Sequence, residues 1–208
     1  AHNKTTDFTV TPAEGYEIDQ VMGCNGSRDG NSYNTGAIRE SCTVTASFKL
    51  IQYDVAAVTG NGGDVSPAST KVEHNQTTFF EITPDEGYVI DTATGCPGSR
   101  EGNIFTTDNI IEACTLSVTF KLIQYDITTS VETTGSGTGG TITPTSLQAE
   151  YGKTYGFTVE ANAGYRIDTA TGCGGSLSGT SFTTGTITSD CTITASFIQQ
   201  FTVTATID

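Results

Sequence analysis

The chain has 208 residues and a formal net charge of −14, from 9 Lys and Arg against 23 Asp and Glu, with 24 Gly, 6 Cys and no Trp. This composition is typical of soluble, globular, acidic proteins and not of disordered ones. Its few, scattered basic residues argue against nucleic acid and anionic membranes as partners, because phosphate groups are bound by Lys and Arg. No apolar run reaches the roughly 18 residues needed to cross a bilayer, so we expect no membrane insertion.

One segment occurs three times in nearly the same form. It reads "GYEIDQVMGCNGS" from Gly15, "GYVIDTATGCPGS" from Gly87 and "GYRIDTATGCGGS" from Gly164, so the copies are 72 and 77 residues apart. Such a period indicates a tandem repeat. The five extra residues of the last copy fall in "VETTGSGTGGTITP", which we interpret as a hairpin turn that has grown longer.

The repeat divides the chain into four parts. We expect a truncated first repeat in residues 1–50, a second in 51–122, a third in 123–199, and the opening strand of a further repeat in 200–208. About twenty residues are expected to be missing from the front of the first. The junctions "FKLIQYDV", "FKLIQYDI" and "FIQQFTVT" contain no flexible linker, which predicts a restricted angle between neighbouring repeats.

Each repeat alternates apolar and polar residues with the period of two that is typical of strands. In the second repeat, Cys114, Leu116, Val118 and Phe120 form an inward stripe, and the first and third repeats have equivalent stripes beginning at residues 42 and 191. Segments such as "TTDNIIEAC" are long enough for only one helical turn. We therefore predict mostly β modules of about 72 to 76 residues, each with about five mainly antiparallel strands.

The six cysteines follow the repeat, with 18 residues between the two members of each pair. Fifteen pairings are possible, but the repeat favours one disulfide within each module. A zinc site needs four ligands, and a module offers two Cys with at most one unmatched His. Disulfides imply an oxidising compartment, so we expect an extracellular or cell-surface location. The predicted pairs are Cys24 with Cys42, Cys96 with Cys114, and Cys173 with Cys191.

The pattern "GGDVSP…TTFFEITPDEGYVIDTATGCPGS…FTTDNIIEACTLSVTF" resembles the divergent internalin-type B-repeat, a module found in tandem on bacterial surface and secreted proteins. The third copy reads "EANAGYRID" and lacks the Pro of the Pro-x-x-Gly-Tyr-x-Ile-Asp signature. The resemblance implies a β-grasp-like fold and a spacer or adhesion role. It implies no catalytic residue and names no ligand.

The Asp that follows Ile in each copy, at positions 19, 91 and 168, is the most conspicuous acidic residue. We interpret it as an acceptor for backbone amides of the following turn. The alternative is a calcium ligand shared with Asp85 or Glu86, although no Asp-x-Asp-x-Asp-Gly loop occurs. Calcium is therefore the only cofactor that the sequence leaves open.

No catalytic set repeats with the modules. His2 and His74 share one repeat position, where the third copy has Tyr151, so a histidine base would be absent from one complete copy. Neither a Gly-x-Ser-x-Gly elbow nor a phosphate-binding loop appears. We therefore expect no enzymatic activity, no catalytic residue and no metal site.

Sugar binding by exposed aromatic rings is harder to exclude. Most aromatic residues fall on the inward stripes, including those equivalent to Phe80 and Tyr88. Phe79, Tyr151 and Tyr155 lie off those stripes and are the possible ligand contacts.

These observations favour a non-catalytic extracellular repeat protein that acts as a rigid stalk, fibre or adhesion array on a bacterial surface. The alternative is a carbohydrate-binding or adhesive appendage of a larger secreted enzyme. The expected partners are neighbouring repeats of the same or another chain, and cell-surface glycans or proteins. "FTVTATID" at the end of the chain could fill the vacant first-strand position of another chain by strand addition.

Overall fold

The computed structural model describes residues 3–132 and 139–205, and these residues form strands, turns and irregular segments but no helix. Their packing separates two compact units, Ala1–Thr83 with Ile90–Thr119 and Pro84–Val89 with Phe120–Asp208. We refer to residues 1–50, 51–122 and 123–199 as the first, second and third copies. The predicted long turn of the third copy lies mostly in residues 133–138, outside the described residues.

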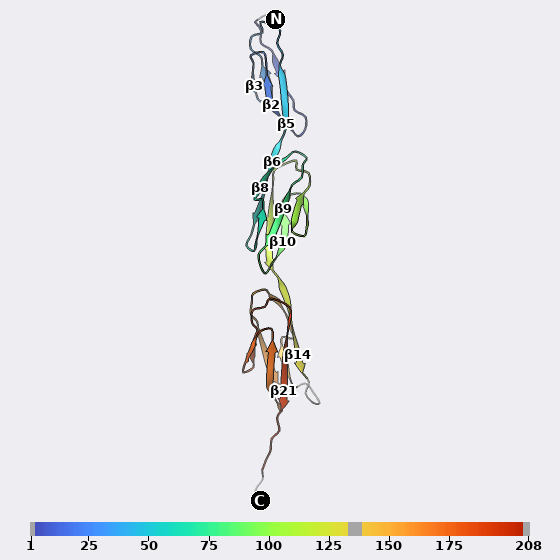
Figure 1. Cartoon of the computed structure of the whole chain (residues 1–208), viewed down its shortest axis with the longest axis vertical. Helices are drawn as coiled ribbons and strands as arrows, with labels where there is room; N and C mark the ends of the chain where they lie inside the picture. The colour runs from blue at the N-terminus through green and yellow to red at the C-terminus, as the bar shows by residue number, and fades with distance from the viewer. Residues whose placement is uncertain (1–2, 133–138, 206–208) are drawn as a thin grey trace. The chain divides into compact units, whose positions relative to one another are not determined.

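The third copy consists of two four-stranded sheets (Figure 1). The first has the order β16-β14-β21-β18 and the second β15-β17-β20-β19. Among the described residues of this copy, the strand pairs are antiparallel except β14 with β21, which places the first and last strands of the copy side by side in parallel. The strands are β14 (Gln124–Glu132), β15 (Gly140–Thr143), β16 (Ser146–Glu150), β17 (Gly156–Ala161), β18 (Tyr165–Gly172), β19 (Ser176–Ser178), β20 (Ser181–Thr183) and β21 (Cys191–Gln199).

One hydrophobic core lies between these two sheets. Ile127 of β14 and Ile193 of β21 come from the first sheet, and Phe157 of β17 and Phe182 of β20 come from the second. Each is at most 3% exposed, whereas the residues that alternate with them along the strands are mostly exposed. The period-two pattern of the sequence thus places one face of each sheet inward.

The second copy repeats this arrangement, with sheets β10-β13-β6-β8 and β11-β12-β9-β7 and a parallel β6–β13 pair. Complete copies therefore have eight strands, where the sequence predicted about five. The additional strands are only three to five residues long, too short for a clear alternating pattern. The strands are β6 (Gln52–Thr59), β7 (Gly63–Ser66), β8 (Ser69–Glu73), β9 (Phe79–Pro84), β10 (Tyr88–Thr94), β11 (Gly98–Glu101), β12 (Ile104–Thr107) and β13 (Cys114–Leu122).

The first copy has smaller sheets, β1-β4-β3 and β2-β5. Within residues 3–50, no strand corresponds to β6, β7 or β8. Its strands are β1 (Asp7–Thr9), β2 (Tyr16–Met22), β3 (Ser27–Asp29), β4 (Ser32–Asn34) and β5 (Thr45–Leu50).

The predicted inward stripe is wrong for this first copy. Phe48 is 43% exposed, although its equivalent Phe197 is 1% exposed. The ring of Phe197 is covered by Gly139 and Gly140 at the start of β15, and a Cβ on Gly140 would lie 2.3 Å from that ring. Residues 3–50 contain no corresponding strand, so the same side chain remains open to solvent.

The segments that could have held a helical turn are irregular. In the second and third copies they contain the buried residues Ile110 and Ile187, each 2% exposed. Residues 201–205, which we call the terminal segment, are exposed and form no strand. The rest of the predicted opening strand, residues 206–208, lies outside the described residues.

The difference between copies predicts different costs for the same substitution. Phe80 is fully buried, so Phe80→Ala should lower the stability of the second copy by about 3–5 kcal/mol through lost burial and the cavity it leaves. The matched control is Phe8→Ala at the equivalent position, where the ring is 44% exposed and the cost should be well under half as large. Native-state hydrogen exchange, resolved by copy, measures both; equal costs would contradict the burial difference.

Candidate functional site

The junctions between copies share one pattern of backbone hydrogen bonds. Only Ile51 separates β5 from β6, and only Ile123 separates β13 from β14. The Ile51 N–H donates to the carbonyl of Gly15 at 2.9 Å, and the Ile51 carbonyl accepts from the N–H of His74 at 2.8 Å. The connecting residue is thus bonded to the first copy through its N–H and to the second through its carbonyl.

The next junction has the same bonds. The Ile123 N–H donates to the carbonyl of Gly87 at 2.8 Å, and the Ile123 carbonyl accepts from the N–H of Tyr151 at 2.9 Å. After the third copy, Gln200 donates its N–H to Gly164 at 2.7 Å, which repeats the first half of the arrangement.

An aromatic ring covers the glycine at each of the two complete junctions. A Cβ atom on Gly15 would lie 2.1 Å from Cδ2 of His74, and one on Gly87 would lie 2.1 Å from Cδ1 of Tyr151. Both glycines also have positive φ, 78° and 81°, which L side chains rarely adopt. Gly164 has the same conformation at 85°, yet nothing lies within 4 Å of its Cβ position.

The two rings have different polar partners. The Tyr151 hydroxyl donates to Oε1 of Glu86 at 2.7 Å, and this hydrogen bond to a carboxylate is the main cause that raises the pKa of Tyr151. In the preceding junction, Nδ1 of His74 lies 3.2 Å from the hydroxyl of Tyr53. The position of the ring is therefore shared, but the chemistry that holds it is not.

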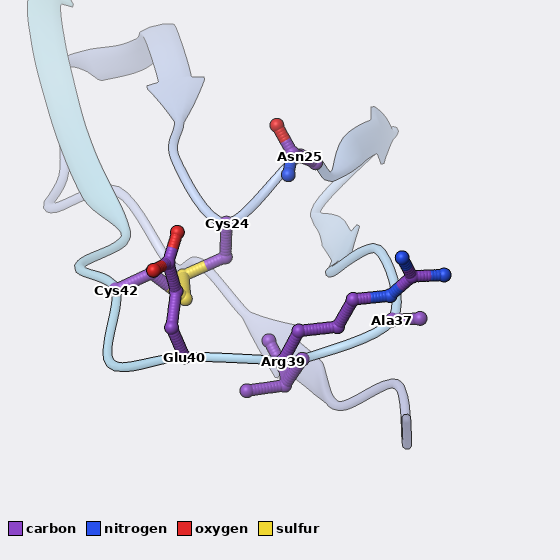
Figure 2. A pocket seen from close by; sticks show the side chains of 7 residues that line it. Cys24, Asn25, Ala37, Arg39, Glu40 and Cys42 are labelled. Carbon is purple, nitrogen blue, oxygen red and sulfur yellow. A yellow bond between two sulfur atoms is a disulfide. The ribbon is translucent and has the colours of Figure 1, made fainter. Parts of the chain in front are cut away.

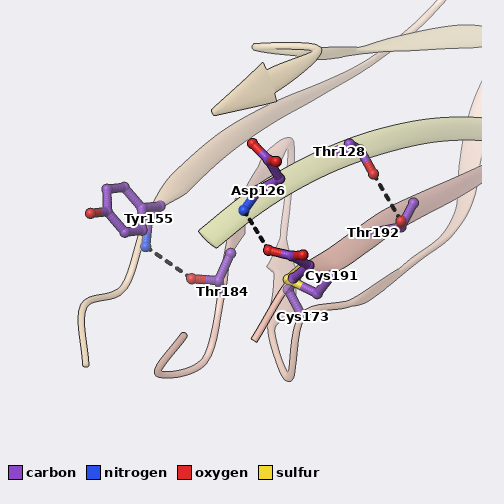
Figure 3. Close-up of a disulfide and its surroundings, with 8 residues drawn as sticks. Asp126, Thr128, Tyr155, Cys173, Thr184, Cys191 and Thr192 are labelled. Atoms are coloured by element: carbon purple, nitrogen blue, oxygen red, sulfur yellow. Dashed lines mark hydrogen bonds between the residues drawn. A yellow bond between two sulfur atoms is a disulfide. The ribbon is translucent and has the colours of Figure 1, made fainter. Parts of the chain in front are cut away.

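The three disulfides have the predicted pairs, and each has a Cα–Cα distance of 5.3 Å. In the third copy the bond joins the turn after β18 to the start of β21, beside the Thr128–Thr192 hydroxyl pair (Figure 3). The residue before the first Cys of each pair has to be glycine, because its backbone conformation and surroundings leave no room for a side chain. A Cβ on Gly172, for example, would lie 2.0 Å from the carbonyl oxygen of Thr192, and its φ is 121°.

A shallow pocket lies beside the Cys24–Cys42 disulfide, and an equivalent one lies beside Cys173–Cys191. Figure 2 shows that the charged ends of Arg39 and Glu40 point to different sides of the first pocket. Nε of Arg39 donates to Oδ1 of Asn3 at 3.2 Å. Across residues 3–132 and 139–205, no group of three or more His, Cys, Asp or Glu could hold a metal ion.

Comparison with protein families places these features in a known module. The model of the divergent InlB B-repeat domain matches residues 53–124 and 129–201, together more than two thirds of the chain. The chain belongs to the divergent InlB B-repeat family. No curated protein and no solved structure shows significant similarity to the chain. The β-rich, disulfide-bonded tandem repeats of the structure agree with the resemblance seen in the sequence.

The three candidate ligand contacts of the B-repeats lie in different local settings. Phe79 lies on the outer face of β9 and is 61% exposed. Tyr151 covers Gly87 at the junction. Tyr155 packs against the core of the third copy, and its hydroxyl accepts from the N–H of Glu150 at 2.8 Å. Only Phe79 among them presents its ring mainly to solvent.

The Asp of the Gly-Tyr-x-Ile-Asp motif lies at a β-bulge. The register of β2 with β5 shifts between Ile18 and Gln20, and the Asp19 carboxylate accepts from the Ser47 hydroxyl at 3.1 Å. In the third copy, Asp168 accepts from Ser196 at 3.4 Å at the same kind of shift. The sequence pointed to backbone amides of the turn, whereas these partners are hydroxyls on the neighbouring strand.

Sequence reasoning missed a buried threonine in each B-repeat. Thr35, Thr107 and Thr184 are 2–4% exposed, and each Oγ1 accepts a backbone N–H across the sheet at 2.9 Å. Figure 3 shows the pair formed by Tyr155 and Thr184. The detectable signal was Thr at one repeat position in all three copies, within "SYNT", "IFTT" and "SFTT".

The raised pKa of Tyr151 predicts a pH dependence of the second junction. A phenol whose folded pKa exceeds its unfolded value of about 10 stabilises the fold fully below that pH. This stabilisation is lost as the pH rises through the folded pKa. Difference ultraviolet titration against Tyr151→Phe should therefore show Tyr151 ionising later than an ordinary tyrosine.

Glu86→Gln should return the Tyr151 titration toward the ordinary value, because it removes the carboxylate acceptor. The matched control is Glu14→Gln, the equivalent acid of the first copy, which should leave this titration unchanged. An unchanged titration in Glu86→Gln would contradict the assigned cause.

Proposed function

We propose that the chain is a non-catalytic extracellular array, in which stiffly joined B-repeats serve as a stalk, fibre or adhesion scaffold on a bacterial surface. The observation that carries this proposal is the doubly bonded connecting residue. Ile51 and Ile123 each have both backbone groups bonded, one to the preceding copy and one to the following copy. A flexible linker would have solvated backbone groups instead.

The glycine–aromatic contact further supports stiffness. Because the rings of His74 and Tyr151 occupy the space next to Gly15 and Gly87, rotation at the connecting residue would separate packed groups and break backbone hydrogen bonds. The combined loss opposes bending at each junction.

Composition and cross-links support an extracellular setting. Disulfides within every copy persist in oxidising compartments, and the family is one of tandem repeats. The described residues contain no helix long and apolar enough to span a membrane. The chain offers its partners strands, turns and exposed sheet faces.

Substitution of the junction glycine tests the proposed stiffness. Gly87→Ala forces a Cβ against the Tyr151 ring and should loosen the junction, whereas Gly164→Ala imposes similar backbone strain where no side chain lies within 4 Å. Residual dipolar couplings should fit one alignment tensor for the second and third copies in the parent protein and in Gly164→Ala. They should require two different tensors in Gly87→Ala.

Separate tensors already in the parent protein would refute a stiff junction. An unaltered single tensor in Gly87→Ala would show that the glycine–aromatic contact does not set the angle.

A second candidate function is carbohydrate binding by an appendage of a larger secreted enzyme, and exposed Phe79 favours it. Its ring lies beside Thr106 in the register of β9 with β12, on a face that combines an apolar ring with hydroxyl groups. This combination suits stacking against a sugar.

A glycan array probed with the parent protein and with Phe79→Ala tests that candidate. Binding that falls at least about tenfold in Phe79→Ala, equivalent to about 1.4 kcal/mol, would support it. Phe8→Ala, which removes an exposed ring at a different repeat position, is the control and should leave binding intact. Absence of glycan binding in the parent protein would remove this candidate.

A further inference from the structure

The outer face of one sheet differs between the two complete copies. This sheet has the order β11-β12-β9-β7 in the second copy and β15-β17-β20-β19 in the third. The inward faces are alike, because Phe80 and Phe105 face each other in one sheet as Phe157 and Phe182 do in the other. Differences on the outward face therefore do not serve the core.

One row of side chains across this outward face carries the difference. In the register of the second copy, Ile104 of β12 lies between Glu81 of β9 and Glu101 of β11. In the third copy the same row contains hydroxyl side chains, those of Thr158, Ser181 and Ser178. An apolar side chain flanked by two carboxylates thus stands where the third copy has three hydroxyl groups.

Phe79 enlarges the apolar part of this face. It lies one row away from Ile104, and the two side chains are 61% and 38% exposed. The third copy has Gly156 at the position of Phe79. All of these second-copy side chains belong to one compact unit of the chain. We call four of them the acidic-apolar patch: Phe79, Glu81, Glu101 and Ile104.

The carboxylates of the patch are not neutralised within the described residues. Neither Glu81 nor Glu101 forms a salt bridge there. Arg100 lies opposite the buried Phe105, on the other side of β11 from Glu101, and its guanidinium donates to the carbonyl of Gly102. The patch therefore combines exposed apolar side chains with uncompensated negative charge.

We propose that the acidic-apolar patch is the docking surface for a basic, apolar protein segment, one that presents large apolar side chains between two Lys or Arg residues. The apolar side chains of such a segment can cover Phe79 and Ile104, while its cations lie beside Glu81 and Glu101. Neighbouring strands are about 4.8 Å apart, so the Cα atoms of the two glutamates are separated by roughly 10 Å. Each carboxylate can therefore receive its own cation.

The same face is the site of the carbohydrate candidate, and its charge favours a protein segment instead. A neutral sugar stacked on Phe79 would remove water from the carboxylates without supplying a counter-charge, which is unfavourable. A basic segment supplies that charge, and the acidic chain, with a net charge of −14, attracts it from a distance. A second copy of this chain would be repelled. Binding should therefore weaken as the salt concentration rises.

This proposal adds a partner to the adhesion role proposed above, but it does not require stiff junctions. Its test is a peptide titration followed by NMR on the full isotope-labelled chain. The probe is the acetylated, amidated peptide Lys-Gly-Leu-Phe-Gly-Lys. Amide shifts should change in β9, β11 and β12 and stay small in β17, β19 and β20, which serve as an internal control. Two matched peptides, Glu-Gly-Leu-Phe-Gly-Glu and Lys-Gly-Ser-Ser-Gly-Lys, should each bind about tenfold more weakly.

Substitutions taken from the third copy should remove the site without unfolding the copy, because the same framework carries them there. Ile104→Ser should weaken peptide binding about tenfold through lost apolar contact. Glu81→Thr combined with Glu101→Ser should weaken it about threefold or more and remove its salt dependence. The control is Val58→Ser, which removes a side chain that is 53% exposed on the other sheet and should leave binding unchanged.

A Lys-Gly-Leu-Phe-Gly-Lys peptide that leaves the amides of β9 and β12 unshifted would overturn the proposal, as would equal binding of the three peptides. Binding that survives in Ile104→Ser would place the contact on another surface and would also overturn it. A glycan that binds in the double glutamate variant but not in Phe79→Ala would assign the face to carbohydrate instead. None of these outcomes changes the dipolar-coupling test of the junctions, so the two proposals can fail separately.

Discussion

The parallel pairing of the first and last strands within a copy is the constraint on which the other features depend. β14 and β21 are at opposite ends of the third copy in sequence, yet they are the two central strands of one of its sheets. Because β14 also continues from β13 after one residue, the strand that completes one core is tied to the end of the preceding copy. The first copy shows the consequence: without a strand at this place among its described residues, Phe48 is exposed.

The same constraint explains why the junction has so little freedom in sequence. A single connecting residue must use its N–H on one copy and its carbonyl on the next, and the turn that receives the N–H must come close to an aromatic ring. Glycine at 15 and 87 meets both the positive φ and the close approach. The ring itself needs only to be flat and of suitable size, which accounts for His74 in one junction and Tyr151 in the other.

The sequence was sufficient for features that follow from repetition and alternation. Period-two stripes predicted a β fold, and the spacing of Cys96 and Cys114 predicted a disulfide within each copy, since repeated modules must satisfy their own cysteines. Strand number could not be predicted, because β11 and β12 are four residues each and resemble turns. The junction was also hidden: His74 and Tyr151 were recognised as equivalent positions, but their contacts with glycines about sixty residues earlier depend on tertiary structure.

The third copy departs from the other two in the turn that would receive a following aromatic ring. Glu14 and Glu86 precede the junction glycines, and Glu86 holds the hydroxyl of Tyr151, but Ala163 precedes Gly164. The glycine, its φ and the bond from Gln200 are all retained, so the space for a ring is still formed. A ring placed there would be held by packing without a carboxylate partner. The backbone geometry of the junction is thus common to all three turns, whereas the polar side chain available to hold the ring differs between them.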